Sequence, residues 1–445
     1  MILRGWVSSR QEKSLPGEKL RMKIACTGFL SEHAGSVAAA NALLLRTLVE
    51  RGVEVDFFSK PSFVDPRPIV GERQGVRFVP TINRISDTIH RKVRRVPFVG
   101  FMAGRRDAVS YNRLLVRRIR QEHQRRGYDL CLWLGDYAWG SVPGLPTISF
   151  VQGAPGTDAR SVLERRDQLK VLCGSWLTLK WMALARLRLS TLGLPRFRHS
   201  DYFIVGSEQS RSTLGRRYRI NSTVIWVVPY PIDLTLFSPS LKEATFGDGT
   251  LRVLWLGRIV PRKRLDLFLQ GAAIAIGRGV DLRLTVVGRV GFICGYERLI
   301  KAFEFSERLE WIESLPRTEV PALFRRHDVL AQPSDEENFG SSVAEAQACG
   351  LPVIVGASNG NADYLCSRDL HLSNDNPETF AQALTDMWRR KQLNLAGDVL
   401  ESRRVAEEYF HIDRVVDRLM RVLNTVLVRV KGGREGMLKE SSSSL

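Results

Sequence analysis

Short apolar runs recur along the first half of the chain, and stretches with helical spacing separate them. The runs read "MKIACTGFL" from residue 22, "VEVDFFS", "GVRFVP", "YDLCLWLG", "TISFVQG" and "YFIVGS". After the first run, apolar residues in 37–48 recur on one helix face, and Gly52 follows as a helix-ending glycine. Strands that alternate with helices predict a parallel, doubly wound sheet.

A second series of the same kind follows in the C-terminal half. Its strands read "LRVLWLGRIV", "LRLTVVG", "RLEWI", "DVLAQPS" and "LPVIVG", and helical patterns such as residues 265–276 and 343–349 lie between them. The polar segment "SPSLKEATFGDGT" separates the two series, so we place an interdomain linker there. Two such sheets bind ligands beyond the carboxyl ends of their strands, which makes the cleft between the domains the expected site.

Composition and charge narrow the class of partner. The length of 445 residues predicts two domains, because a single domain with one hydrophobic core is rarely this long. Lys and Arg number 66 against 47 for Asp and Glu, a net charge of +19, which favours anionic partners such as phosphorylated substrates or an anionic membrane face. No motif typical of nucleic-acid recognition accompanies the charge, so we expect no nucleic-acid partner.

The cysteines and the apolar stretches indicate a cytoplasmic protein. The 6 cysteines are scattered without a Cys-x-x-Cys pair, which argues against a disulfide framework and a zinc site. Residues 1–21 lack the apolar core of a signal peptide. We expect them to be a flexible extension or the product of an upstream start codon. No apolar run reaches about 18 residues, so no transmembrane helix is expected.

The first candidate for chemistry is "LWLGRIVPRKRLD". A strand is expected to end at Gly257, and the next helix to begin near Lys263 or Arg264. Arg258 and Lys263 would then lie at the carboxyl edge of the sheet beside a helix N-terminus, where cations and backbone N–H groups can bind a diphosphate. A solvated basic turn is the alternative interpretation of this segment.

The second candidate is "DEENFGSSVAEAQACG", residues 335–350. Glu337 falls on a loop and Glu345 about one turn inside a helix for which Ser341 or Ser342 is the expected N-cap. Gly340 allows close backbone approach, and nearby N–H groups are expected to be free for an anion. Two carboxylates at this separation suit an extended ligand with hydroxyls at both ends, although a capping acid and a surface acid are the simpler interpretation.

The glycine patterns exclude two common nucleotide-binding classes. The chain has no Gly-x4-Gly-Lys-Ser/Thr loop, and "GRVGFICG", which contains Gly288, is a weak glycine-rich loop. These observations argue against a P-loop NTPase and against a nicotinamide dehydrogenase.

The order of these motifs resembles a known family. "VPYPIDLTLFSP", "GRIVPRKRLD", "LTVVG" and "LEWIESLPRTEVPALFRRHDVLAQPSDEENFGSSVAEAQACGLPVIVG" follow one another as in the retaining glycosyltransferases of family 4, the glycosyl transferases group 1, which have the GT-B fold. The resemblance is strong from about residue 252 to 356 and looser in the N-terminal half. It implies an α/β fold of two Rossmann-like, doubly wound parallel-sheet domains facing a central cleft.

The resemblance also implies residue roles. Arg258 and Lys263 would bind the donor diphosphate and stabilise the leaving nucleotide, with Glu337 at the donor sugar. Glu345 would accept hydrogen bonds from the ribose, and Asp335 and Glu336 would take no part. The rest of the implied donor site is Gly257, Gly288, Phe339, Gly340, Ser341, and Trp311 with Ile312 beside the base. In the N-terminal domain, the loop residues near the donor phosphate or acceptor are Gly35, Ser36 and Gln152.

The chain departs from the family pattern at several positions. The familiar Asn-Gly before Ile232 is replaced by Tyr230 and Pro231, the usual glycine after Ile312 is Glu313, and Gln152 stands nearest to a frequent histidine. These departures affect the donor sugar and the acceptor rather than nucleotide binding. The sequence contains no Asp-x-Asp, so neither a metal ion nor a cofactor is expected in the donor site.

A basic stretch with tryptophans, residues 161–200, has two interpretations. It contains Trp176 and Trp181 among leucines, lysines and arginines. Such a segment can lie on an anionic membrane surface with its arginines toward lipid phosphates. Alternatively, it is a buried helix pair with cations that reach solvent.

The sequence therefore predicts a retaining glycosyltransferase without a metal ion. It would move a sugar from a UDP- or GDP-sugar to a hydroxyl of a glycan or a lipid-linked intermediate, as in polysaccharide biosynthesis, in the cytoplasm or at the inner membrane face. The alternatives are an inactive nucleotide-sugar-binding protein, a sugar-phosphate phosphorylase or epimerase, and a basic membrane-surface adaptor. The expected domains are 22–238 on the acceptor side, 239–400 on the donor side, a crossing helix at 401–430 and a disordered tail at 431–445.

Overall fold

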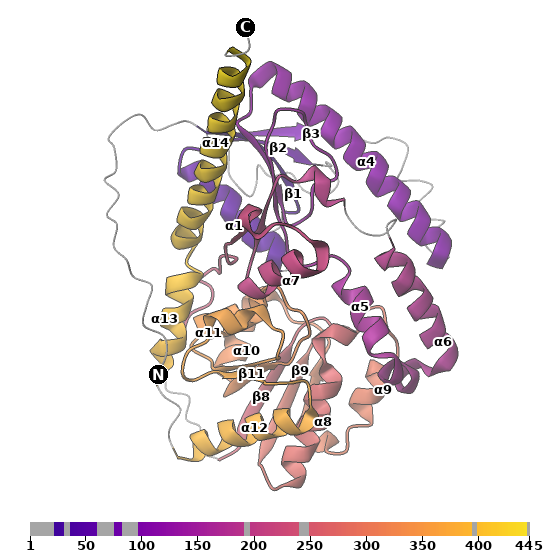
Figure 1. Cartoon of the computed structure of the whole chain (residues 1–445). Helices are drawn as coiled ribbons and strands as arrows, with labels where there is room; N and C mark the ends of the chain where they lie inside the picture. The colour runs from indigo at the N-terminus through magenta and orange to yellow at the C-terminus, as the bar shows by residue number, and fades with distance from the viewer. Residues whose placement is uncertain are drawn as a thin grey trace.

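Two parallel β-sheets organise the protein (Figure 1). The computed structural model describes residues 22–30, 36–59, 75–81, 97–190, 196–239, 249–393 and 398–442. Seven strands of the N-terminal half pair in the order β3-β2-β1-β4-β5-β6-β7, and six strands of the C-terminal half pair in the order β10-β9-β8-β11-β12-β13. The predicted α/β fold with two doubly wound parallel sheets is confirmed.

The strands coincide with the predicted apolar runs, because buried parallel strands need apolar side chains on both faces. In the N-terminal sheet the strands are β1 (Lys23–Gly28), β2 (Glu54–Ser59), β3 (Val76–Pro80), β4 (Leu130–Leu134), β5 (Thr147–Phe150), β6 (Tyr202–Val205) and β7 (Ile225–Val227). In the C-terminal sheet they are β8 (Leu251–Leu256), β9 (Leu282–Val287), β10 (Leu309–Ile312), β11 (Val329–Gln332), β12 (Val353–Val355) and β13 (Leu370–His371). Sequence analysis missed two short strands, β7 and β13.

Helices cover both sheets. In the N-terminal half they are α1 (Ser36–Glu50), α4 (Pro97–Arg126), α5 (Thr157–Glu164), α6 (Arg166–Leu189) and α7 (Glu208–Tyr218). In the C-terminal half they are α8 (Leu265–Gly277), α9 (Tyr296–Lys301), α10 (Val320–Arg325), α11 (Ser341–Ala348), α12 (Pro377–Gln392), α13 (Val399–Tyr409) and α14 (Ile412–Ser442). Within the described part of the chain, no helix is long and apolar enough to cross a bilayer.

Neighbouring strands approach one another closely at the carboxyl edge of each sheet. A Cβ atom on Gly288, which follows β9, would stand 1.8 Å from the carbonyl oxygen of Gly257, which follows β8. A Cβ on Gly28, at the end of β1, would stand 2.5 Å from the carbonyl oxygen of Leu134 in β4. Glycine is required at both positions, because any side chain there would force neighbouring strands apart.

Helices α5 and α6 connect strands of the N-terminal sheet but pack on the C-terminal domain (Figure 1). Val162, Leu169 and Leu172 belong to the same apolar core as strands β8 and β9. The guanidinium of Arg298 in α9 donates a hydrogen bond of 2.5 Å to the carbonyl of Leu172. Part of α6 is therefore buried, as the interpretation of residues 161–189 as a buried helix pair expects. The membrane interpretation concerns the side chains of α6 that remain exposed.

The C-terminal helices return to the N-terminal domain. Helix α13 packs on α11 of the C-terminal domain, and α14 runs along α1 (Figure 1). Arg51 of α1 forms ion pairs with Asp413 at 2.8 Å and Asp417 at 3.0 Å on α14. Helix α14 continues to Ser442, beyond residue 430, where we expected the tail to begin.

Candidate functional site

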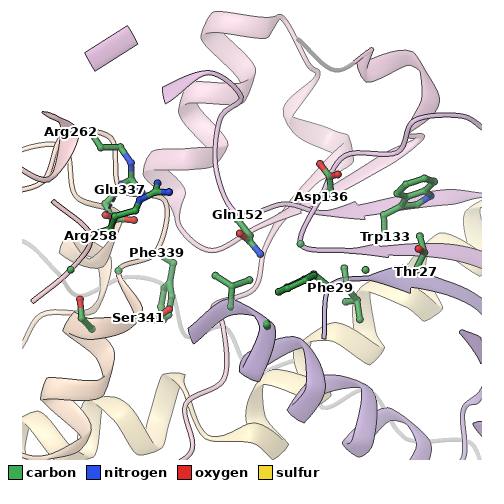
Figure 2. Close-up of a pocket in the computed structure, with 18 of the residues that line it drawn as sticks. Thr27, Phe29, Trp133, Asp136, Gln152, Arg258, Arg262, Glu337, Phe339 and Ser341 are labelled. Atoms are coloured by element: carbon green, nitrogen blue, oxygen red, sulfur yellow. Dashed lines mark hydrogen bonds and ion pairs between the residues drawn. The ribbon is translucent and has the colours of Figure 1, made fainter. Parts of the chain in front are cut away.

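A cavity of about 1000 Å³ lies between the carboxyl edges of the two sheets (Figure 2). The N-terminal domain contributes Thr27, Phe29, Trp133, Asp136 and Gln152, among others, to its wall. The opposite wall comes from the C-terminal domain and consists of Gly257, Arg258, Arg262, Lys263, Glu337, Phe339, Gly340, Ser341, Ser342 and Glu345. The two predicted motifs and Gln152 thus meet in one cavity.

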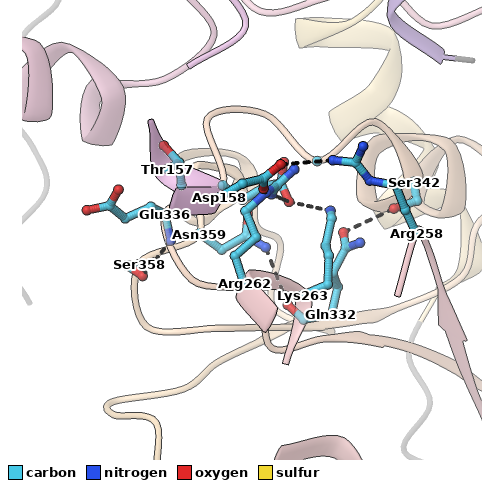
Figure 3. A network of polar contacts seen from close by, with 12 residues as sticks. Thr157, Asp158, Arg258, Arg262, Lys263, Gln332, Glu336, Ser342, Ser358 and Asn359 are labelled. Carbon is cyan, nitrogen blue, oxygen red and sulfur yellow. Dashed lines mark hydrogen bonds and ion pairs between the residues drawn. The ribbon is translucent and has the colours of Figure 1, made fainter. Parts of the chain in front are cut away.

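Three cations come from the segment after β8. The chain leaves the strand at Gly257 and forms a single 3-10 turn at Pro261–Lys263 before α8 begins. This turn directs Arg262 and Lys263 toward the loop after β11 (Figure 3). Arg262 is a residue that sequence analysis missed, although it lies inside the quoted motif.

Carboxylates pair with these cations (Figure 3). Glu337 pairs with Lys263 and, at 2.9 Å, with Arg262. Asp158, in the first turn of α5, accepts from Arg262 at 2.6 Å and from Arg258 at 3.1 Å. Asp158 was not predicted, because it comes from another domain about one hundred residues earlier in the chain.

Glu337 remains ionised in this surrounding. Burial alone would raise the pKa of its carboxyl group, but the attraction of Arg262 and Lys263 outweighs burial and lowers the pKa. An anionic ligand that binds Arg262 and Lys263 would therefore compete with the negatively charged carboxylate of Glu337.

Glu345 lies deeper in the same wall, on α11. Its Oε1 atom accepts a hydrogen bond of 2.8 Å from Arg317, and only 4% of the residue is exposed. Burial raises the pKa of this carboxyl group, and Arg317 opposes that change. The second carboxylate oxygen has lone pairs for a hydroxyl donor from the cavity.

The loop before α11 differs from expectation in two details. Gly340, rather than Ser341 or Ser342, is the N-cap residue, and no side chain caps the helix. The N–H of Gly340 donates to the side-chain oxygen of Asn361, so it is not free for an anion as we expected. Ser342 donates instead to Gln332 at 3.0 Å.

Phe339 lines the cavity, and its ring contacts residues of both halves of the chain. Its ring lies 5.7 Å from that of Tyr230 in the N-terminal half and 5.3 Å from that of Phe410 before α14. Aromatic contacts at these distances fix the loop that carries Glu337 and Gly340.

Other predicted residues lie outside the cavity wall. Gly288, Trp311 and Ile312 cluster at the ends of β9 and β10, where the indole N–H of Trp311 donates to the carbonyl of Gly288 at 3.0 Å. Gly35 lies outside the described residues. Ser36 is the first residue of α1, and Val37 and Ala38 of the same helix line the cavity.

Asp335 and Glu336, which we expected to take no part, connect the domains. Glu336 pairs with Arg160 of α5 at 2.8 Å and with Arg217 of α7 at 2.5 Å. Asp335 pairs with Arg165 at 2.9 Å. These ion pairs join the N-terminal domain to the loop after β11, and no local sequence pattern could have indicated them.

No metal site is evident in the part of the chain that the structure describes. Across those residues, no three His, Cys, Asp or Glu side chains gather in a way that could hold a metal ion.

Two Rossmann-like parallel-sheet domains with a cavity between the carboxyl edges of their sheets are the architecture of the GT-B fold. Solved structures of this class share the fold. The chain is similar to the sucrose-phosphate synthase from Thermosynechococcus elongatus, with a TM-score of 0.63, 17% identity, and 92% of this chain and 100% of that chain covered. It is also similar to Anabaena HepE in complex with UDP and glucose, with a TM-score of 0.58, 15% identity, and 91% and 99% covered.

Sequence comparison agrees with the fold. Residues 240–397 match the family model of the glycosyl transferases group 1. The chain is 24% identical over 335 residues to the D-inositol 3-phosphate glycosyltransferase of Pseudarthrobacter chlorophenolicus, which covers 73% of this chain and 74% of the relative. Residues 240–397 are therefore similar to the glycosyl transferases group 1, and the curated relatives that match a larger part of the chain are named glycosyltransferases.

Proposed function

We propose that this glycosyltransferase moves a sugar, with retention of anomeric configuration, from a nucleoside diphosphate sugar to a hydroxyl of a glycan or lipid-linked acceptor. UDP- and GDP-sugars are the proposed donors, and no metal ion is required. The observation that carries the proposal is the cluster of Arg258, Arg262 and Lys263 at the carboxyl edge of the C-terminal sheet. These three cations complement the negative charge of a diphosphate better than any other group in the cavity wall does.

The cations would act on the leaving group. As the bond between the sugar and the diphosphate breaks, negative charge grows on the β-phosphate, and fixed cations in a partly dry cavity stabilise it. The diphosphate would displace Asp158 from Arg258 and Arg262, while Glu337 stays beside Lys263 and contacts the donor sugar. Retention rests on the resemblance to the retaining glycosyltransferases of family 4.

Donor cleavage tests the proposal. The purified protein is incubated with UDP-, GDP- and ADP-sugars in EDTA, and nucleotide release and the anomeric configuration of the product are followed by NMR. We expect slow release of one nucleotide and an unchanged configuration. Tight nucleotide binding without release would favour an inactive nucleotide-sugar-binding protein, and an inverted product would contradict retention.

Glu345→Ala is expected to weaken nucleotide binding by about 1–3 kcal/mol, because a charged acceptor for the ribose hydroxyls is lost. Calorimetry with UDP and GDP measures the effect. Glu319→Ala, which removes an exposed acid close in sequence to Arg317, is the matched control and should leave affinity unchanged. Equal affinity of the Glu345 variant and the control would contradict the ribose role.

A membrane-associated location is the second part of the proposal, and exposed apolar side chains on both sides of the α6 kink at Gly174 support it. Val171 is 83%, Trp176 is 80% and Leu179 is 55% exposed, although Leu172 and Met182 of the same helix are buried. Lys170, Lys180 and Arg186 are exposed beside them. Apolar side chains flanked by cations fit an anionic lipid surface, and the net charge of +19 points the same way.

Replacing Val171, Trp176 and Leu179 together by serine is expected to lower vesicle binding more than tenfold, since each inserted apolar side chain contributes about 1.5–3 kcal/mol. Co-sedimentation with phosphatidylglycerol-containing vesicles measures binding. Leu393→Ser, at a residue that is 67% exposed on another helix end, is the control. Equal binding of the triple variant and the control would exclude α6 as the contact.

A further inference from the structure

Asn338 lies between Glu337 and Phe339 in the loop after β11, and its side chain binds the N-terminal domain. Its amide nitrogen donates to the carbonyl oxygen of Val151 at 3.3 Å, and its amide oxygen accepts from the backbone N–H of Gly206 at 3.2 Å. Val151 follows β5 and Gly206 follows β6, so both partners lie at the carboxyl edge of the N-terminal sheet. One side chain of the loop thus connects to two strand ends of the other domain.

Both hydrogen bonds of Asn338 are buried, and each needs its own end of the amide group. The residue is only 3% exposed. A backbone carbonyl can only accept and a backbone N–H can only donate, so the amide supplies one donor and one acceptor in the required order. Removing the side chain would leave two buried backbone groups without this partner, which is unfavourable.

Two glycines of the N-terminal domain leave room for this contact. A Cβ on Gly206 would stand 2.8 Å from the Cβ of Phe339, and a Cβ on Gly153 would stand 3.1 Å from the Cβ of Asn338. Carbon atoms attract each other best at about 3.5–4.0 Å, so a side chain at residue 206 would push the loop away from the sheet. The close fit therefore depends on glycine at this position.

The residue on the other side of Glu337 is bound to the same domain. The carboxylate of Glu336 pairs with Arg160 at 2.8 Å and with Arg217 at 2.5 Å. Glu336 has a left-handed φ of 44°, which residues with a Cβ atom rarely adopt, so tertiary contacts must hold it. Glu337 is thus flanked on both sides by residues anchored to the N-terminal domain, while its own carboxylate pairs with Lys263.

We propose that Asn338 is a positioning residue, which holds the carboxylate of Glu337 at the donor sugar by binding the strand ends of the N-terminal sheet. This inference rests on the proposed function, in which Glu337 contacts that sugar. Asn338 is not part of the wall of the donor cavity, so it acts through Glu337 rather than by touching the donor. The docking of the two domains then determines the geometry of the donor site.

Binding of the donor with and without its sugar separates positioning from stability. Asn338→Ala is expected to slow cleavage of the UDP-, GDP- or ADP-sugar that the wild type cleaves by about 10²-fold, the effect of displacing a group at the reacting centre by about 1 Å. In calorimetry, UDP or GDP alone should bind with unchanged affinity, because Arg258 and Lys263 lie on another segment. The additional affinity of the nucleotide sugar should fall about tenfold, as one hydrogen bond to a charged group is weakened.

The matched control for this variant is Gln382→Ala. Gln382 is an exposed amide side chain on α12 and does not line the donor cavity. The control should keep the wild-type rate and both affinities.

Gly206→Ala tests the same contact from the opposite domain. The added Cβ would meet Phe339 and displace the loop without changing any residue of the loop. Cleavage should slow and the nucleotide affinity should stay unchanged, as for Asn338→Ala. Gly277→Ala, at the end of α8, is the control, because a Cβ there meets no atom within 4 Å.

The outcomes separate the inference from the proposed function. If the wild type cleaves a donor and a folded Asn338→Ala variant keeps its rate and its affinity for the nucleotide sugar, the inference is wrong and the proposed function stands. An equal loss of affinity for the nucleotide and the nucleotide sugar also contradicts the inference, because the defect then does not concern Glu337. If the wild type neither binds nor cleaves any of the donors, both are wrong.

Stability of the variants does not leave the question open. If Asn338→Ala does not fold, Gly206→Ala is judged by the same two criteria. If neither variant folds, the contact serves stability alone and the inference is wrong.

Discussion

Replacing Lys263 by alanine is expected to reduce the turnover of sugar transfer about 10²–10³-fold, the usual effect of removing one group that stabilises charge in the transition state. The ammonium group of Lys263 lies beside Glu337 in the wall of the cavity, where the β-phosphate of the donor would lie. Arg258 and Arg262 remain in the variant, so binding of the free nucleotide should weaken less than turnover. Steady-state rates with the active donor, together with calorimetry for the nucleotide, measure both effects.

Lys301→Ala is the matched control for this variant. Lys301 is an exposed lysine at the end of α9 and does not line the cavity. The control should keep the wild-type rate. A correctly folded Lys263 variant that also keeps the full rate would show that the leaving group does not depend on this cation.

Replacing Arg264 by alanine is expected to destabilise the fold by about 3–5 kcal/mol, the usual cost of leaving buried carboxylates without their partner. Arg264 is 4% exposed and lies between Asp266 at 3.2 Å and Asp335 at 3.4 Å. Burial has already raised the pKa of Asp335 to about 6, against the attraction of Arg264 and Arg165. Without Arg264, both acids lose a buried partner, and denaturant unfolding would measure the change.

The backbone of Arg264 allows a sharper comparison. Its φ is 53°, in the left-handed region that disfavours residues with a Cβ atom. Arg264→Gly should therefore be more stable than Arg264→Ala by about 1 kcal/mol, with the charge lost in both. Arg278→Ala, which removes an exposed ion pair with Glu378 at 2.5 Å, should change stability by less than about 1 kcal/mol. Equal stability of all three variants would contradict the role of the buried cluster.

The C-terminal half of the site was predictable because its residues lie on short motifs. The apolar run of β8 ends at Leu256, so Arg258 and Lys263 had to lie at the carboxyl edge of the sheet. The run of β11 likewise placed Glu337 on the loop that follows it. In each case the end of the apolar run marks the end of the strand. The residues that follow must lie at the carboxyl edge of the sheet, because all strands of a parallel sheet end at the same edge.

Contacts across the cleft could not be predicted in this way. The ion pairs from Asp158 to Arg258 and Arg262 and from Glu336 to Arg160 join residues 100 to 176 positions apart. The local sequence around a charged loop residue looks the same whether its side chain contacts solvent or pairs with a residue of the other domain. The cap of α11 was misassigned for a related reason, because Asn361, 21 residues further along the chain, accepts from the N–H of Gly340.

The sequence by itself determined the alternation of strands and helices, the two parallel sheets and the basic and acidic motifs at their carboxyl edges. These follow from local periodicity and from where apolar runs end. Only the tertiary structure decided that Asp158 pairs with Arg258 and Arg262, that α5 and α6 pack on the C-terminal domain, and that Glu336 pairs with Arg160. The physical reason is that each depends on the docking of two domains, whose contacts have no sequence period.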